Sequence, residues 1–276
     1  MKIILPVPLI FFGLFIFSSC KKDSPSSGGS SNTGIGTKLV RIQQGTDPTT
    51  DTVFKIIYSG DNIAKIYDSI FAGTIEPDTL STIFINGTLV SASDESGFSA
   101  NYSYNSSSQI STIDAMVVGE HDVYTYTYNN GILAQKTWSS DLGRGGTPTL
   151  YVTSKYTVTN GNITEIKEYE NGNDLFDDLT LTYSSQAQPA VFKQLAVLNI
   201  GNILGLDHIL GFDSYTFDSF LNTNLVTGCS EGGSSGNATF TNTFNAQQQP
   251  VKIVTNIPET FSGFTVGLST WFFTYN

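Results

Sequence analysis

Short runs of β-branched and aromatic residues alternate with turn residues along the chain from about Leu39 onward. In the stretch YTYTYNNGILAQKTW, apolar and polar positions alternate up to Asn130-Gly131 and resume directly after it. Asn-Gly supplies the positive φ values of a type I′ turn, which matches the twist of two antiparallel strands. The pattern therefore predicts a β-hairpin in which an anchor residue, Tyr128, lies opposite Leu133.

The same spacing of anchor, turn and apolar partner recurs along the chain. Six cross-strand pairs are predicted, the last three with one more residue in the loop: Tyr58/Ile63, Tyr128/Leu133, Val158/Ile163, Tyr104/Ile110, Tyr183/Pro189 and Phe244/Pro250. A seventh hairpin, around Asn86-Gly87, lies outside the repeat, so at least fourteen strands are expected. The predicted fold class is all-β: an antiparallel meander of repeated β-hairpins forming a large curved sheet or a closed barrel.

The repeat does not decide which face of the sheet is buried. Ile63 and Ile66 are three residues apart, so in a regular strand they point to opposite faces unless a bulge intervenes. A single curved sheet covered on both faces and a barrel with a packed interior both satisfy this spacing. Closure into a barrel would block the edges of a long meander most completely.

One segment, residues 190–221, breaks the β rhythm. Phe192, Leu195 and Leu198 are three residues apart, which predicts a short amphipathic helical insert near residues 190–212. Gly201 and Gly205 cost a helix about 1 kcal/mol each and would divide it. We expect the insert to plug one end of the sheet or to cover a face, and the alternative is that it lines a ligand site.

The first twenty residues carry an export and attachment signal. Residues 3–17 are mostly apolar but reach only roughly 22 Å as a helix, short of the roughly 30 Å of a hydrocarbon core. A lysine before a short apolar run predicts a signal peptide over residues 1–19. Phe17-Ser18-Ser19-Cys20 resembles the bacterial lipobox, which implies lipidation of Cys20 and membrane attachment through that lipid. The alternative is an ordinary signal peptide in which Cys20 is incidental.

Residues 20–37 are rich in Ser and Gly and predict a flexible tether behind the lipidated cysteine. Residues 38–276 are then expected to form a single all-β repeat domain that contains the insert 190–221. With Cys20 lipidated, Cys229 has no disulfide partner and is expected to be a small buried or loop residue.

The pattern Tyr-x-Tyr-Asn-Asn-Gly-x-Leu at residues 126–133 resembles a shortened YD repeat of the Rhs type. Its recurrence behind a lipobox is similar to envelope lipoproteins of Bacteroidota with YD-like repeats, a family of unknown function. The resemblance implies a porin-like β fold over roughly residues 38–276. It also implies a lipid-anchored location at the outer membrane, and we expect the protein to face outward.

Composition narrows the function classes further. The chain has a net charge of −11, and its 13 Lys and Arg residues form no cluster. An acidic chain repels phosphate backbones, so no nucleic acid partner is expected. Hydrophobic residues make up 39% of the chain, with 19 Phe and 13 Tyr, which is enough for a packed core.

Candidate chemistry is sparse in the sequence. His121 is flanked by Glu120 and Asp122, but adjacent strand residues point apart, so they form no triad. His208, in the apolar insert, fits a structural histidine better than a catalytic one. The stretch ENGNDLFDD, residues 170–178, has oxygen ligands for calcium but lacks the EF-hand spacing, which favours a solvated loop. We assign no catalytic residue, no cofactor and no metal site.

Three functions are compatible with the sequence. The first is a non-enzymatic surface module that binds a glycan or a protein or has a structural role. The second is a carrier that holds a small apolar ligand in a barrel cavity. The third is a polysaccharide hydrolase without a recognisable motif, for which Glu165 and Glu168 are the carboxylates to consider. An interior cavity would favour the second function, and a cleft with two facing carboxylates would favour the third.

Overall fold

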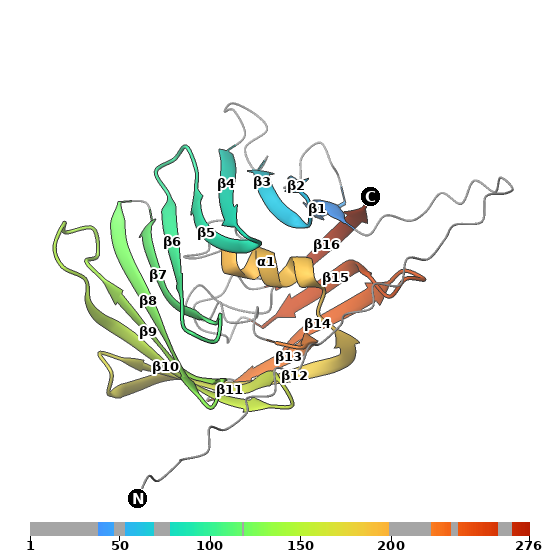
Figure 1. Cartoon of the computed structure of the whole chain (residues 1–276). Coiled ribbons are helices and arrows are strands. Elements are labelled where there is room, and N and C mark those ends of the chain that lie inside the picture. Colours follow the sequence, from blue (N-terminus) through green and yellow to red (C-terminus); the bar gives the residue numbers. More distant parts are fainter. Residues whose placement is uncertain are drawn as a thin grey trace, which may run out of the picture. The chain divides into compact units, whose positions relative to one another are not determined.

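Sixteen antiparallel strands and one short helix make up the part of the chain that the computed structural model describes (Figure 1). The described residues are 38–46, 53–68, 78–117, 119–198, 222–232, 237–258 and 267–276. The strands are β1 (Leu39–Gln44), β2 (Val53–Ser59), β3 (Asn62–Asp68), β4 (Asp78–Ile85), β5 (Thr88–Ser93), β6 (Ser99–Tyr104), β7 (Ile110–Val117), β8 (Glu120–Asn129), β9 (Ile132–Ser140), β10 (Thr149–Thr159), β11 (Asn162–Glu170), β12 (Asp174–Ala187), β13 (Asn224–Glu231), β14 (Asn237–Phe244), β15 (Pro250–Ile257) and β16 (Gly267–Tyr275). The helix, α1 (Ala190–Leu198), lies between β12 and β13 in the chain.

Each strand pairs with its neighbours in sequence, and β1 pairs with β16 to close the barrel. The predicted antiparallel meander is confirmed, and of the two architectures considered the closed barrel is the one that forms. Closure gives every strand a partner on both sides, so the meander has no open edge.

The predicted hairpin register is confirmed in five of the six repeats. The observed pairs are Tyr58/Ile63, Tyr128/Leu133, Val158/Ile163, Tyr104/Ile110 and Phe244/Pro250. The hairpin around Asn86-Gly87 also forms, between β4 and β5. Asn130 and Gly131 both have positive φ, as a type I′ turn requires.

A β-bulge next to each of these turns settles which residues face inward. In β3 the register passes from the Tyr58/Ile63 pair directly to Ile57/Lys65, which leaves Ala64 as the extra residue. The bulge brings Ile63 and Ile66 to the same face, and both are buried. The bulge alternative considered from the sequence is therefore correct.

The predicted pair of Tyr183 with Pro189 is wrong. Strand β12 continues past Tyr183, which pairs with Val226 of β13. Pro189 directly precedes α1, and its carbonyl accepts a hydrogen bond from the Phe192 amide at 3.0 Å. A proline suits a helix start because its fixed φ is helical and the amide hydrogen it lacks would have no partner there. The loop-like stretch SSQAQP is therefore the end of a long strand followed by a helix.

The interior of the barrel is apolar. Inward-facing Ile, Leu, Phe, Tyr and Trp side chains of the strands form one buried cluster, which also includes Phe192, Leu195 and Leu198 of α1. Helix α1 lies within the ring of strands (Figure 1). Its Phe192 ring contacts the Phe273 ring, with 5.2 Å between the ring centroids. The predicted helix is confirmed over residues 190–198. The remainder of the insert, up to residue 221, lies outside the described residues, as do residues 1–37 with Cys20.

The outer wall of the barrel carries polar and charged side chains together with scattered exposed apolar ones such as Ile57, Ile83 and Leu268. On β14, Ala238 and Phe240 face the interior, whereas Thr239 and Thr241 are exposed. A cross-strand row on β10, β11 and β12 places charged side chains on the outside in successive register: Lys155, Lys167 and Asp178. Within the described residues, no helix has the length and apolar character needed to cross a membrane.

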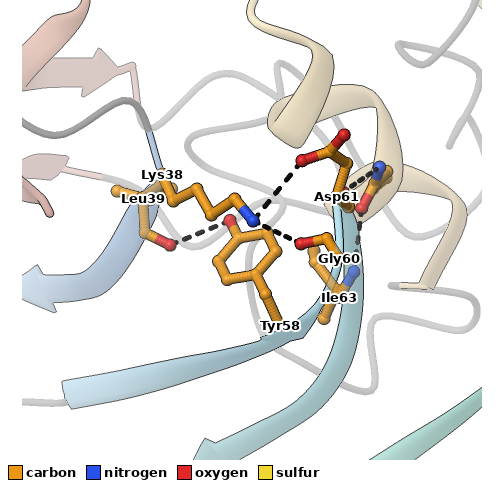
Figure 2. Close-up of polar contacts among 7 residues, drawn as sticks. Lys38, Leu39, Tyr58, Gly60, Asp61 and Ile63 are labelled. Carbon is orange, nitrogen blue, oxygen red and sulfur yellow. Dashed lines mark hydrogen bonds and ion pairs between the residues drawn. The ribbon is translucent and has the colours of Figure 1, made fainter.

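A tyrosine hydroxyl links one strand to the strand before it at the turn end of the barrel, the end with the Asn-Gly turns. Figure 2 shows the first example, in which the Tyr58 hydroxyl of β2 donates to the Leu39 carbonyl of β1 at 2.9 Å. The same bond recurs around the ring in four further pairs: Tyr104 to Leu89, Tyr128 to Ile110, Tyr183 to Ile163 and Tyr275 to Pro250. These bonds hold the turn ends of neighbouring strands in register.

Candidate ligand site

Helix α1 is fixed to the inner wall at the turn end by its polar side chain Gln194 and by its backbone. The Gln194 amide oxygen accepts a hydrogen bond from the Ile63 backbone amide at 3.2 Å, and the Gln194 amide nitrogen donates to the Asp61 carbonyl at 3.3 Å. On the neighbouring part of the wall, the Tyr102 hydroxyl donates to the Val197 carbonyl at 3.2 Å. The helix is therefore held at its middle, through Gln194, and near its C-terminal end, through Val197.

A partly open cavity of about 180 Å³ lies between α1 and the hairpins β4–β5 and β6–β7. Its walls are mostly apolar, and the residues that line it are Phe84, Leu89, Tyr104, Ile110, Lys193, Gln194, Val197 and Leu198. The two hairpins contribute their turn-proximal residues, and α1 contributes one face of its last two turns. Helix α1 thus packs against the inner face of the sheet, one of the roles expected of the insert, and it also lines this cavity.

Lys193 is the charged residue of this cavity. Its side chain is half-buried, and no carboxylate elsewhere in the described ranges forms an ion pair with it. The Gln194 amide is occupied by the β2–β3 turn. The Tyr104 hydroxyl is occupied by the Leu89 carbonyl at 2.8 Å. A cavity of this kind can hold a small molecule with an apolar body and one acidic group.

A second notable feature is a row of polar side chains inside the barrel. Lys136, Ser154, Glu168 and Asp177 occupy successive register positions on β9, β10, β11 and β12. All four are buried, and the Ser154 hydroxyl donates to Glu168 Oε1 at 2.8 Å. Two carboxylates, Glu168 and Asp177, are therefore direct cross-strand neighbours in a mostly apolar interior.

Sequence reasoning did not find this row, although it named Glu168 and Glu165 as carboxylates to consider. Glu168 faces inward, whereas Glu165 faces outward and accepts from the Thr157 hydroxyl at 2.8 Å. The bulge after each turn shifts the inward phase by one residue, so alternation counted from the turn gives the wrong face. The row could have been found by placing one bulge after each turn and then pairing the strands, which puts Lys136, Ser154 and Glu168 side by side.

The histidine region matches its prediction. His121 faces outward, where its Nε2 lies 3.1 Å from Asp114 Oδ1. Asp122 faces inward and is buried, with the Tyr124 hydroxyl 3.4 Å from its Oδ2. The two neighbours therefore point to opposite sides of the wall. His208 lies outside the described residues.

The acidic stretch 170–178 is spread over both faces of the wall. Asp177 points into the barrel, whereas Asp178 lies outside, 3.9 Å from Lys167 Nζ. Across the parts of the chain that the structure covers, no group of three or more His, Cys, Asp or Glu side chains converges on a possible metal position.

Cys229 is buried in β13. Burial raises the pKa of its thiol, and the nearby carboxylates Asp177 and Glu231 raise it further. A thiol in this setting stays protonated and is a poor nucleophile. The prediction that Cys229 is a small buried residue is confirmed.

Comparison with known proteins identifies the fold. No family model matches the sequence, and no curated protein matches it. Among solved structures, a porin-like protein from Bacteroides uniformis superimposes with a TM-score of 0.57 at 16% sequence identity, covering 87% of this chain and 99% of that one. A porin-like protein from Bacteroides vulgatus gives a TM-score of 0.44 at 14% identity, covering 86% and 98%. The first likeness extends over nearly the whole barrel, and at this identity it shows the fold alone.

Proposed function

We propose that this chain is a non-enzymatic, lipid-anchored binding protein of the bacterial cell envelope, whose barrel lies in water at the end of a tether. The observation that carries the proposal is the polarity of the barrel wall. A membrane-spanning barrel has an apolar outer band and a polar interior. This barrel has charged and polar side chains on its outer wall, with only scattered apolar ones among them, and an interior that is mostly apolar apart from one row of buried polar side chains.

The cost of placing this outer wall in lipid supports the proposal. A lysine on the lipid-facing side of a barrel costs about 2–4 kcal/mol at the middle of the bilayer. The outward row contains Lys155 and Lys167, with Asp178 beside them, in the middle of three long strands. Lys167 Nζ lies 2.8 Å from Glu165 in a solvent-exposed ion pair, as on a surface that faces water.

Attachment to the membrane is assigned to the segment before the barrel. In this proposal residues 1–19 are removed as a signal peptide, Cys20 carries the lipid, and residues 20–37 form the tether. A flexible chain of that length has an average end-to-end distance of roughly 20–25 Å, so the barrel would stand clear of the lipid surface. We place it on the outer face of the outer membrane, where it would bind a glycan or a protein.

Membrane fractionation tests the proposal. The Cys20→Ser variant is expected in the soluble fraction, whereas the unchanged chain and a Cys229→Ser control stay with the membranes through a high-salt wash. A Cys20→Ser variant that stays in the membrane through the salt wash would show that the barrel or the apolar segment 3–17 holds it there, which would contradict attachment through the lipid alone. Protease treatment of intact cells tests the orientation, since only an outward-facing barrel is degraded.

The cavity beside α1 favours a second candidate function, the carrier of a small apolar ligand. Its apolar lining with a few polar groups is typical of a small-molecule site, and its volume of about 180 Å³ restricts it to a small ligand. A carrier and a surface-binding module are compatible on one tethered barrel.

A further inference from the structure

We propose that the cavity between α1 and the hairpins β4–β5 and β6–β7 binds an anionic amphiphile: a carboxylic acid with an apolar body of about six to eight carbons. Lys193 would hold the carboxylate at the rim. This inference rests on the carrier function proposed above and names its ligand class.

The size of the ligand follows from the volume of the cavity. An apolar protein cavity of about 150 Å³ takes up benzene, a six-carbon ring. The cavity beside α1 measures about 180 Å³, which is somewhat larger. A ring with a short side chain or a folded chain of similar carbon count fills that volume, and a long-chain lipid exceeds it.

The charge of the ligand follows from the polar groups of the lining. Gln194 and the hydroxyl of Tyr104 already make hydrogen bonds within the protein. The ammonium of Lys193 is half-buried, and no described carboxylate pairs with it. A partly buried cation is stabilised by an opposite charge at hydrogen-bond distance, and a carboxylate supplies one. A cationic amphiphile of the same length would be repelled.

The walls of the cavity are held in place before any ligand arrives. Tyr102 bonds the carbonyl of Val197 at 3.2 Å, and Gln194 bonds the β2–β3 turn. Tyr104 is tied to the hairpin β4–β5 through Leu89. Because both sides are fixed, a ligand does not have to order the site, and more of its burial energy contributes to affinity.

Isothermal titration calorimetry with three eight-carbon probes tests the proposal on the full chain carrying Cys20→Ser. Octanoate is expected to bind at one site, octanol more weakly, and octylamine not measurably. Lys193→Gln should weaken octanoate binding at least about tenfold and leave octanol binding unchanged. Lys65→Gln, which changes an exposed lysine on the outside of β3, is the matched control and should bind octanoate as the parent chain does.

A variant that fills the cavity supplies the second test. Val197→Phe should abolish the binding of both octanoate and octanol. A phenylalanine at this position can also unfold the helix, so octanoate-induced shifts of the Leu89 and Ile110 methyl signals in the parent chain give an independent readout. Absence of both calorimetric binding and methyl shifts would overturn the site, and equal octanoate affinity in Lys193→Gln would overturn the assigned carboxylate contact. Fractionation is read without any ligand, so failure of the anchored-barrel proposal is distinguishable from failure of this one.

Discussion

The hydroxyl of Tyr128 lies 2.9 Å from the carbonyl oxygen of Ile110, to which it donates a hydrogen bond. Tyr128 is the anchor of the hairpin β8–β9, and Ile110 is the residue that follows the turn of the hairpin before it. The bond therefore joins two consecutive hairpins at the turn end. The recurring anchor tyrosine therefore has two roles: it pairs across its own hairpin, and it donates a hydrogen bond to the hairpin before it.

Replacing Tyr128 with phenylalanine removes this bond and leaves the apolar ring in place. The Ile110 carbonyl loses a partner in a half-buried position, so we expect a loss of about 1 kcal/mol in the free energy of unfolding. Tyr67 faces outward on β3 opposite Lys55, and no hydrogen bond joins its hydroxyl to another described residue. Urea unfolding of Tyr128→Phe and of the control Tyr67→Phe measures the difference, and equal stabilities would contradict the role of the bond.

Alkaline pH should destabilise the barrel through its buried tyrosines. Burial raises the pKa of Tyr58 from 10.0 to about 12, because the tyrosinate anion would be desolvated. A phenol whose pKa is higher in the folded state contributes stability that is fully present below pH 10 and is lost as the pH rises toward 12. The free energy of unfolding is therefore expected to fall in this window.

Tyr58→Phe isolates the contribution of this residue, because lysines titrate in the same pH range. The variant loses the bond to Leu39, which gives a constant offset at neutral pH. Above pH 10 its stability should fall less steeply than that of the parent chain. Parallel curves from pH 8 to pH 12 would show that Tyr58 ionises equally well in both states.

The turn glycines should differ in their tolerance of valine. Gly131 has a φ of 78° with open space around it, so valine there is strained by the backbone alone, at about 1–2 kcal/mol. Gly161 has a φ of 76°, and a Cβ would also lie 2.7 Å from the Thr223 methyl group. Gly146 has open space and no positive φ, which makes it the control. Melting temperatures should fall in the order Gly146→Val, Gly131→Val, Gly161→Val, and three equal values would refute the strain argument.

Local chemistry explains which features the sequence could predict. The pairs Tyr58/Ile63 and Tyr128/Leu133 follow from turn geometry, which two or three residues determine. The Tyr183/Pro189 pair failed because proline suits both the start of a helix and a hairpin partner, and the choice depends on where β13 lies. The structure of residues 183–189 is therefore determined by a contact with a distant strand and not by the local sequence.

The interior polar row lay beyond sequence reasoning for a related reason. Whether Glu168 or Glu165 faces inward depends on the bulge beside the Asn160-Gly161 turn, which shifts the strand by one residue. The cavity beside α1 depends on how Gln194 and Tyr102 hold the helix against strands more than ninety residues away in the chain. Neither relationship leaves a local pattern in the sequence.

The last prediction concerns catalysis: we expect the purified chain to hydrolyse no common glycan, ester or peptide substrate. Glu168 and Asp177 are the carboxylates best placed for acid and base roles, because they are cross-strand neighbours in the interior. Both are buried in the polar row that also contains Lys136 and Ser154, and Glu168 already accepts a hydrogen bond from the Ser154 hydroxyl at 2.8 Å. A glycosidase needs its two carboxylates on either side of a bound sugar, roughly 5–10 Å apart, with room for the substrate between them. Glu168 is 0% exposed and Asp177 is 7% exposed, so a sugar cannot reach a position between them. A substrate screen with the parent chain, Glu168→Gln, Asp177→Asn and the exposed control Glu165→Gln decides the matter. Turnover that persists in Glu165→Gln but disappears in Glu168→Gln or Asp177→Asn would establish the hydrolase alternative and end the non-enzymatic proposal.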